Sequence, residues 1–569
     1  MRYRNSLSSR FFILAVSTSA LTIVSTAAHS QVNIPSTARP EVIQRQIQNS
    51  QRPEVTGEQL ITVQDKESKT LKGNVSFRLK IIEFNGMTAE DMRNIKPIYE
   101  EKLRKDINLR ELNEIADKIT SYYRNKGFIL NRAVVPPQRI KDGVVRINII
   151  QGFVSDVQLK GDVDVTDSIL HEYAEKIKES KPLDAKTLER YLLLMEDLPG
   201  VEARAVIQPS ADTPHASLVT VNIKRNKFEG STIRVNNRGT RFLGTTQAIG
   251  VFAVNNMLGM NEQTAFRVIN TPFEPDELKY FGVRHEQPIN SYGTKAAIDL
   301  SFIETNPGHN LEVLDVEGTN YEVNASISHP IMRSRQSNLF VNTDFSIQRV
   351  NLSVLDANIY NDNLRIWTTE LTYDFVDETN AVNRLESSFA KGLNWFADSA
   401  SLPHSRAGGK ASFEKFNANF TRIQPVYGSW SISTSVDGQY SLDPLYSAQE
   451  YAIGGAQFGS AYDPAEITGD SGIAGRLELQ YNGNTENKYV TSFQSYGFYD
   501  LGKVWNRNIV ANSEPKDNSL ASAGIGTRFN ILDSLTGDVE LAFPLTRDVA
   551  AYGADGSAPR IFFNMQYRY

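Results

Sequence analysis

The chain contains no cysteine, few histidines and none of the common nucleotide-binding motifs among its 569 residues. The absence of thiols excludes disulfides, thiol catalysis and thiolate metal sites. The seven histidines are scattered without an H-E-x-x-H or other clustered spacing, so we expect no metal site. No phosphate loop of the G-x-x-x-x-G-K-S/T type and no dinucleotide fingerprint is present. The sequence therefore predicts neither a cofactor nor nucleotide hydrolysis.

Long hydrophobic runs and an excess of positive charge are also missing. The mean hydropathy is -0.36, and the longest apolar stretch, Phe11 to Val24, is interrupted by Ser17 to Ser19 and by Thr22. A membrane-spanning helix needs about 20 apolar residues, so an α-helical membrane protein is excluded. The net charge of -6 and the pI of about 5.8 argue against a nucleic-acid partner, because phosphate binding requires a basic surface.

The N-terminus has the features of a secretory signal peptide. Arg2, Arg4 and Arg10 precede the apolar stretch, and the small residues Ala28 and Ser30 follow it. We predict that residues 1–30 form a signal peptide cleaved near Ser30; an uncleaved anchor is the alternative.

Residues 31–73 are predicted to hold a short helix and a linker. Val42, Ile43 and Ile47 form one helical stripe within Pro40 to Gln51, and the following residues are too polar to bury much surface. An unstructured leader is the alternative.

Two similar units follow, at residues 74–153 and 154–226, each with the order β-α-α-β-β. Leu112, Ile115, Ile119 and Tyr122 mark the second helix of the first unit. The predicted strands of the two units lie at residues 77–84, 128–135, 144–150, 157–159, 201–207 and 218–223, and the clearest helices of the second unit lie at 168–177 and 185–197.

Residues 227–569 are a succession of segments in which apolar and polar residues alternate. In Asn338 to Gln348, Leu339, Val341 and Phe345 alternate with polar residues, so that one face suits lipid and the other water. About 16 such segments predict an all-β transmembrane barrel of about 16 antiparallel strands, closed because lipid does not tolerate free sheet edges. A barrel enzyme is an alternative, but polar lumens supply carboxylate pairs freely, and we expect no catalysis.

Several spaced motifs are similar to those of a known family. They are Ser121 to Phe128, Val135 to Gln138, Asp142-Gly143, Gln151-Gly152, Leu192 to Gly200, Asn236 to Gly239 and Asn255 to Gly259. With these the chain resembles the two-partner secretion transporters of the haemolysin activation/secretion type, within the outer-membrane assembly-factor superfamily. The resemblance implies two α+β POTRA domains before the barrel.

The resemblance also implies a function and a location. The barrel would lie in the outer membrane, in contact with its lipids, and the POTRA domains in the periplasm. They would capture a large exoprotein with an N-terminal secretion domain, which the barrel exports to the cell surface or medium; periplasmic chaperones are further candidate partners. An assembly factor for other barrels is the alternative, although two POTRA domains and a plug helix at Pro40 to Gln51 favour secretion. A diffusion porin would leave roughly 150 periplasmic residues without a role.

The family's functional centre is a long loop that folds back into the barrel, where its tip arginine meets an aspartate of a Phe-x-Asp-x-Gly strand motif. The strand motif is present here as Phe498, Asp500 and Gly502. The loop tip corresponds to Gly459, Ser460, Ala461 and Tyr462, so a serine stands at the arginine position.

Asp500 therefore needs another partner, because an unpaired buried carboxylate is costly. Period-2 counting places Arg476 on the inward face of the preceding strand, and we predict an Arg476–Asp500 pair. A hydrated Asp500 in a wet lumen is the alternative.

The resemblance places the cargo-binding groove in the first POTRA unit. We expect the strand edge that holds Ile129, Leu130, Val134 and Val135 to pair with an extended cargo segment. The same side chains also suit an ordinary core.

Overall fold

The computed structural model describes residues 34–48, 61–63, 76–163, 167–395, 403–507, 515–532 and 534–569. The predicted signal peptide lies outside these residues, as does the end of the predicted plug segment, residues 49–51. Within the described residues, no helix has the length and apolarity that crossing a membrane requires.

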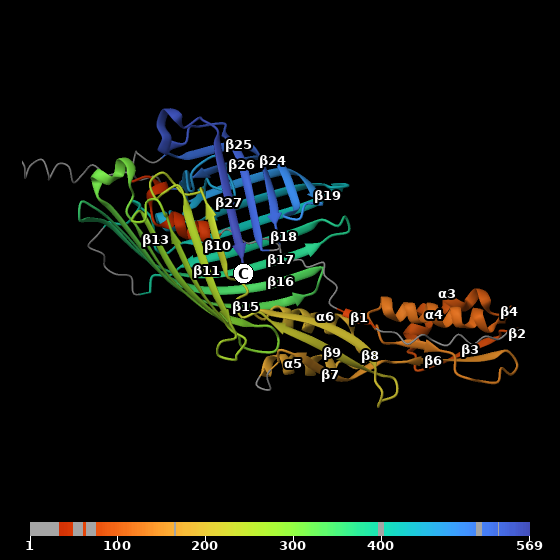
Figure 1. Cartoon of the computed structure of the whole chain (residues 1–569). Coiled ribbons are helices and arrows are strands. Elements are labelled where there is room, and N and C mark those ends of the chain that lie inside the picture. Colours follow the sequence, from red (N-terminus) through yellow and green to blue (C-terminus); the bar gives the residue numbers. More distant parts are fainter. Residues whose placement is uncertain are drawn as a thin grey trace, which may run out of the picture.

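Sixteen antiparallel strands form a closed barrel, which confirms the predicted fold class (Figure 1). The first and last strands close it, since β10 pairs with β27 from Thr232 opposite Arg568 to Asn236 opposite Asn564. The strands are β10 (Thr232–Asn236), β11 (Gln247–Asn255), β12 (Gln263–Asn270), β13 (Leu278–Pro288), β14 (Lys295–Thr305), β15 (Val316–Arg333), β16 (Ser337–Val354), β17 (Ala357–Val376), β18 (Val382–Gly392), β19 (Glu414–Tyr427), β20 (Trp430–Ser441), β23 (Ser471–Asn484), β24 (Val490–Trp505), β25 (Asp517–Ile531), β26 (Leu535–Pro544) and β27 (Arg560–Arg568).

Side chains alternate between the outer surface and the lumen along these strands. In β16, Ile347 is exposed on the outside whereas Ser346 and Gln348 are buried inside. In β27, Ile561 is 66% exposed and Phe562 only 3%. The apolar outer face and the polar inner face are those that the period-2 pattern predicts.

The first POTRA unit contains β2 (Ser76–Arg78), β3 (Ile81–Asn85), α3 (Ala89–Tyr99), η2 (Glu100–Lys102), β4 (Asp106–Asn108), α4 (Leu109–Asn125), β5 (Arg132–Val134) and β6 (Val144–Ile150). Its main sheet has the order β3-β6-β5, and the buried stripe of α4 packs in the same core.

Two strand predictions in this unit were wrong in extent. The strand expected at 77–84 is split, because Leu79 turns into the core and β2 pairs with β4 while β3 pairs with β6. The strand expected at 128–135 is reduced to β5. Phe128 to Asn131 instead form a turn, in which the Asn131 N–H donates to the carbonyl of Phe128 at 3.1 Å.

The second POTRA unit repeats the order with β7 (Phe153–Gly161), α5 (Ser168–Glu179), α6 (Ala185–Glu196), β8 (Val201–Pro209) and β9 (Ala216–Arg225). A short strand of the N-terminal linker, β1 (Ile61–Val63), pairs in parallel with β8. The sheet order is therefore β1-β8-β9-β7, with the linker covering the edge that β8 would otherwise expose.

Helix α6 docks the second POTRA unit on the periplasmic turns of the barrel. Arg190 donates to the carbonyls of Tyr292 and Pro330 at 3.3 and 2.9 Å. Arg333, at the end of β15, forms an ion pair of 2.6 Å with Asp197. These contacts identify the β13–β14 and β15–β16 turns as the barrel end nearest the POTRA units, as Figure 1 also shows.

A buried aspartate connects the two helices of the first POTRA unit. Asp91 of α3 accepts hydrogen bonds from Thr88 at 2.8 Å, Tyr122 at 3.2 Å and Lys126 at 2.8 Å. Burial by itself raises the pKa of Asp91, but the hydrogen bonds from Lys126 and Thr88 and the charge of Lys126 outweigh it and lower the pKa. Asp91 thus explains why the motif Ser121 to Phe128 combines tyrosines with a lysine.

Asp91→Asn should destabilise a soluble fragment of residues 76–225 by about 1–3 kcal/mol at pH 7, because the charged hydrogen bonds are lost. Since the folded pKa is lowered, the carboxylate stabilises the fold above its unfolded pKa of about 4, and this contribution is lost as the pH falls through the folded value. Urea unfolding at several pH values measures both effects, with the exposed pair variant Lys96→Ala as control. Equal stability of the Asp91→Asn variant and the unmodified fragment at pH 7 would refute the role of Asp91.

Candidate functional site

The loop between β20 and β23, residues 442–470, folds back onto the inner wall of the barrel. It contains η4 (Ser447–Gln449) and a hairpin of β21 (Tyr451–Ile453) and β22 (Ile467–Gly469). Phe458, Ala461 and Tyr462 of the loop share one apolar cluster with inward residues of the wall, Tyr496 and Phe562 among them. The loop is thus part of the packed interior of the barrel.

Ser460, at the loop tip, is fully buried and is held by its backbone as well as its side chain. Its N–H donates to Asp500 at 3.2 Å, and its hydroxyl donates to Glu540 at 2.7 Å. Arg238, from the turn between β10 and β11, donates to the Ser460 carbonyl at 3.0 Å and forms an ion pair of 2.9 Å with Glu540. The cation at the loop tip therefore comes from the wall.

The structure brings Arg476 and Asp500 together. They are directly opposite in the β23–β24 ladder, and Arg476 Nη1 lies 3.3 Å from Asp500 Oδ2. Arg476 also contacts Glu540 at 3.4 Å. The Asp500 side chain has no exposed surface and accepts a further hydrogen bond from Ser522. The hydrated alternative therefore does not describe this structure.

Phe498 and Gly502, the other two residues of the strand motif, also contribute to the site. The guanidinium of Arg476 lies 3.9 Å from the centre of the Phe498 ring, in a cation–π contact. A Cβ atom at Gly502 would lie 2.5 Å from Cδ1 of Ile453 in the loop hairpin. Gly502 thus provides the space in which the loop approaches the wall.

A second ion pair holds the loop beyond its tip. Arg560 of β27 lies 2.8 Å from Asp463 and donates to the carbonyl of Ala461 at 3.0 Å. The hydroxyl of Tyr462 donates to the carbonyl of Ala521 at 3.2 Å. The loop is therefore held at the seam between β10 and β27, the first and last strands of the barrel, because Arg238 and Arg560 lie on either side of this seam.

The N-terminal segment lies inside the barrel, where Figure 1 draws it in red. It consists of η1 (Ser36–Ala38) and α2 (Glu41–Gln48), a helix where one was expected. Ile34, Ala38 and Ile43 pack against Tyr280 of the wall and against Leu311 of the β14–β15 loop.

Polar contacts connect this segment to the wall and to the folded-back loop. Gln44 donates to Glu322 of β15 at 2.6 Å. Ser36 donates to the carbonyl of Ala465 at 2.7 Å, and Arg39 donates to Ser447 at 2.8 Å. The helix segment and the loop thus occupy the lumen as one connected body.

The residues expected at the cargo edge are not all on a strand. Val134 belongs to β5, which is an edge strand paired with β6 among the residues that the structure describes, and is 39% exposed. Val135 follows β5 and packs against the core of the first POTRA unit. Ile129 and Leu130 lie in the preceding turn and pack against the second POTRA unit. Their assignment to a strand edge was wrong, because the turn after Gly127 directs them into the junction between the units.

Sequence reasoning missed Arg238, Glu540 and Arg560. The signal for Arg238 was present in Asn236-Asn-Arg-Gly239, which we used only as a turn motif. Glu540 alternates with outward residues of its strand, so its inward position was readable from the sequence. Arg238 and Glu540 meet at Ser460 because of the path of the folded-back loop, and the period-2 pattern does not predict that path.

Comparisons with known proteins agree with this architecture. The family model of the haemolysin secretion/activation proteins ShlB/FhaC/HecB matches residues 215–529, and that of the ShlB-type POTRA domain matches residues 77–152. The heme/hemopexin transporter protein HuxB of Haemophilus influenzae is 20% identical over 519 residues, which cover 90% of this chain and 91% of HuxB.

Two solved structures share the fold. CdiB from Escherichia coli matches with a TM-score of 0.69 and 16% identity over 100% of both chains. BamA from Haemophilus ducreyi without its POTRA domains 1–3 matches with a TM-score of 0.52 and 13% identity over 87% of this chain and 100% of the BamA chain.

The Arg476–Asp500 pair should show energetic coupling. Arg476→Ala and Asp500→Ala should each lower the thermal stability of the barrel with its loop, and the double variant should lose less than the sum, with a coupling of about 1–3 kcal/mol because the pair is buried. Ser460→Arg should partly restore Arg476→Ala. Calorimetry in detergent gives the midpoint of thermal unfolding for all four variants. Strictly additive losses of stability would show that Arg476 and Asp500 do not act as a pair.

Proposed function

The chain belongs to the family of haemolysin secretion/activation proteins ShlB/FhaC/HecB, and we propose that its barrel opens by moving the loop and the plug helix aside to let an extended exoprotein pass. It is a two-partner secretion transporter of the outer membrane, with its POTRA domains in the periplasm. We assign residues 1–30 to a signal peptide, 31–73 to plug and linker, 74–153 and 154–226 to the POTRA domains, and 227–569 to the barrel.

The main support for the proposal is that the polar lumen is filled by two segments of the chain that noncovalent contacts hold in place. Barrels of 16 to 18 strands enclose an aqueous channel unless something occupies it. Here the occupants are the loop and α2, held by hydrogen bonds such as Gln44 to Glu322 and by ion pairs such as Arg560 to Asp463. These contacts form with groups that water can also satisfy, so the lumen can open without any strand of the wall being lost.

Capture in the periplasm is proposed at the β5 edge. Within the described residues, β5 is an edge of its sheet with β6 on one side, whereas the corresponding strand of the second unit, β8, is covered by the linker strand β1. Val134 and Val135 would then flank an extended segment of the exoprotein, bound through main-chain hydrogen bonds. Folding of the cargo outside the cell supplies the driving force in this proposal, and periplasmic chaperones would keep the cargo unfolded.

An assembly factor for other barrels remains the second candidate function. The BamA likeness supports it at the level of fold. The plug segment favours secretion, because a lumen sealed by a removable helix suits passage through the barrel rather than insertion beside it. No catalytic role is proposed, since the relatives are transporters.

Deleting residues 74–224 should abolish export while the truncated barrel still reaches the outer membrane, because capture and pore formation lie in separate domains. Secretion of the partner exoprotein is measured in the medium, and heat-modifiable migration of the membrane protein shows that the barrel has folded. Undiminished secretion by the truncated protein would reject the capture role.

Deleting residues 34–48 should raise the conductance of the barrel in planar bilayers several-fold, since the helix fills part of the lumen. The double variant Arg39→Ala/Gln44→Ala keeps the helix but loses two of its polar contacts, so it should give intermediate, fluctuating conductance. The exposed variant Lys503→Ala serves as control. If the deletion leaves the conductance unchanged, the segment is not a plug.

A further inference from the structure

The outward face of β16 changes from apolar to polar toward the end of the strand. On β16 the outward residues are apolar or small from Leu339 to Ile347, and Arg349, Asn351 and Ser353 follow. This apolar run measures about 27 Å along the strand, or about 21 Å in height at a tilt of about 40°. Since the apolar band of outer-membrane barrels is about 25 Å high, Arg349 stands at its edge.

This edge of the apolar band faces the cell exterior. The opposite end of the same strands carries the contacts with the second POTRA unit, such as the Arg333–Asp197 pair. Two aromatic side chains, both about half exposed, accompany Arg349 on the neighbouring strands: Tyr321 lies directly opposite it on β15, and Trp367 follows Arg365 by two residues on β17. Aromatic side chains of this kind mark the boundary between hydrocarbon and headgroups.

Two arginines lie side by side at this boundary. Arg349 pairs with Asn363 in the β16–β17 ladder, and Arg365 is two residues farther along β17 on the same outward face. Diagonal neighbours of this kind are about 7–8 Å apart, which allows two guanidinium groups to reach one phosphate. Arg349 donates to Asn363 at 2.8 Å, and this bond orients the guanidinium on the outer surface.

Three outward lysines near the external rim have carboxylate partners. Lys279 lies 3.1 Å from Glu304, Lys391 lies 2.6 Å from Glu414, and Lys503 lies 3.1 Å from Asp517. Arg365, by contrast, forms no ion pair with any residue in the part of the chain that the structure describes. Arg365 therefore leaves positive charge at the membrane boundary, beside Arg349.

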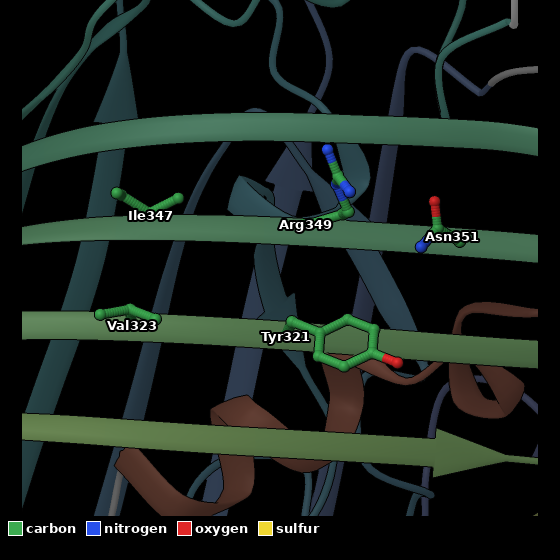
Figure 2. A pocket seen from close by; sticks show the side chains of 5 residues that line it. All are labelled: Tyr321, Val323, Ile347, Arg349 and Asn351. Atoms are coloured by element: carbon green, nitrogen blue, oxygen red, sulfur yellow. The ribbon is translucent and has the colours of Figure 1, made fainter.

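A shallow groove runs directly beside this charge. Tyr321, Val323, Ile347, Arg349 and Asn351 line a space of about 410 Å³ on the outer surface of β15 and β16 (Figure 2). One part of it is apolar, formed by Val323 and Ile347, and the other is polar, formed by Arg349, Asn351 and the Tyr321 hydroxyl. An acyl chain fits the first part and an anionic headgroup fits the second.

We propose that this groove binds a phosphorylated lipid of the outer leaflet, with Arg349 and Arg365 holding the phosphate and Tyr321, Val323 and Ile347 contacting an acyl chain. Arginine pairs suit phosphate because the planar guanidinium donates two parallel hydrogen bonds. The site is separate from the export machinery in the lumen. It would fix one wall of the barrel in the leaflet while the opposite wall, beside the seam, carries the loop contacts.

The test measures binding of diphosphoryl lipid A to the full-length protein in phosphatidylcholine nanodiscs that contain a varied fraction of this lipid. Arg349→Gln/Arg365→Gln should weaken the binding about tenfold or more, because two charge-assisted contacts are lost. Arg349→Lys/Arg365→Lys keeps the charge and should lose less. The control Lys279→Gln/Lys503→Gln also removes two positive charges, but from lysines that form ion pairs, and it should change lipid A binding less than twofold. Heat-modifiable migration verifies that every variant is folded.

Two further probes separate the possible ligands. Dephosphorylated lipid A should bind the unmodified protein no more tightly than it binds the double glutamine variant. Inorganic phosphate at millimolar concentration should not displace the lipid, because it lacks the acyl contacts. Equal lipid A binding by the unmodified protein and the glutamine variant would overturn the proposal, and so would full displacement by inorganic phosphate.

Discussion

The rest of this structure depends on one constraint, that hydrocarbon offers no partner for a backbone N–H or C=O group. Every strand in the membrane must therefore pair on both sides, and the sheet must close on itself. Closure is completed between β10 and β27, whose ladder extends over only five residue pairs. The same constraint fixes the alternation of side chains, because one face of each strand meets lipid and the other faces the lumen.

A closed barrel of this size creates the next requirement, which is to fill its polar interior. The loop and α2 fill it with groups that match the wall in charge. Arg238, Arg476 and Arg560 form ion pairs with Glu540, Asp500 and Asp463, and these pairs lie around the loop tip. These pairs hold the loop tip, which has Ser460 and no arginine of its own. The cations come from the wall, and the tip contributes its backbone and one hydroxyl.

Those features that follow from local periodicity were predictable from the sequence. The barrel was predictable because lipid imposes the period of two, and the Arg476–Asp500 contact because both residues lie on adjacent strands. Arg238 was not, because it reaches Ser460 across the seam between β10 and β27 only when the barrel is closed and the loop is folded in. Ile129 and Leu130 resembled a strand in composition. Gly127, with a φ of +100°, ends the helix before them and turns the chain toward the second POTRA unit.

In the proposed opening of the barrel, the folded-back loop leaves the wall before the cargo passes. The absence of cysteine makes a direct measurement possible, because Ala461→Cys/Ser522→Cys would introduce the only thiols into the chain. The Ala461 N–H lies 3.4 Å from Ser522 Oγ, so a disulfide there would tie the loop tip to β25. The proposed opening requires that the oxidised double variant secretes little of its partner exoprotein and that a reductant restores secretion. Undiminished secretion by the fully oxidised protein would contradict it.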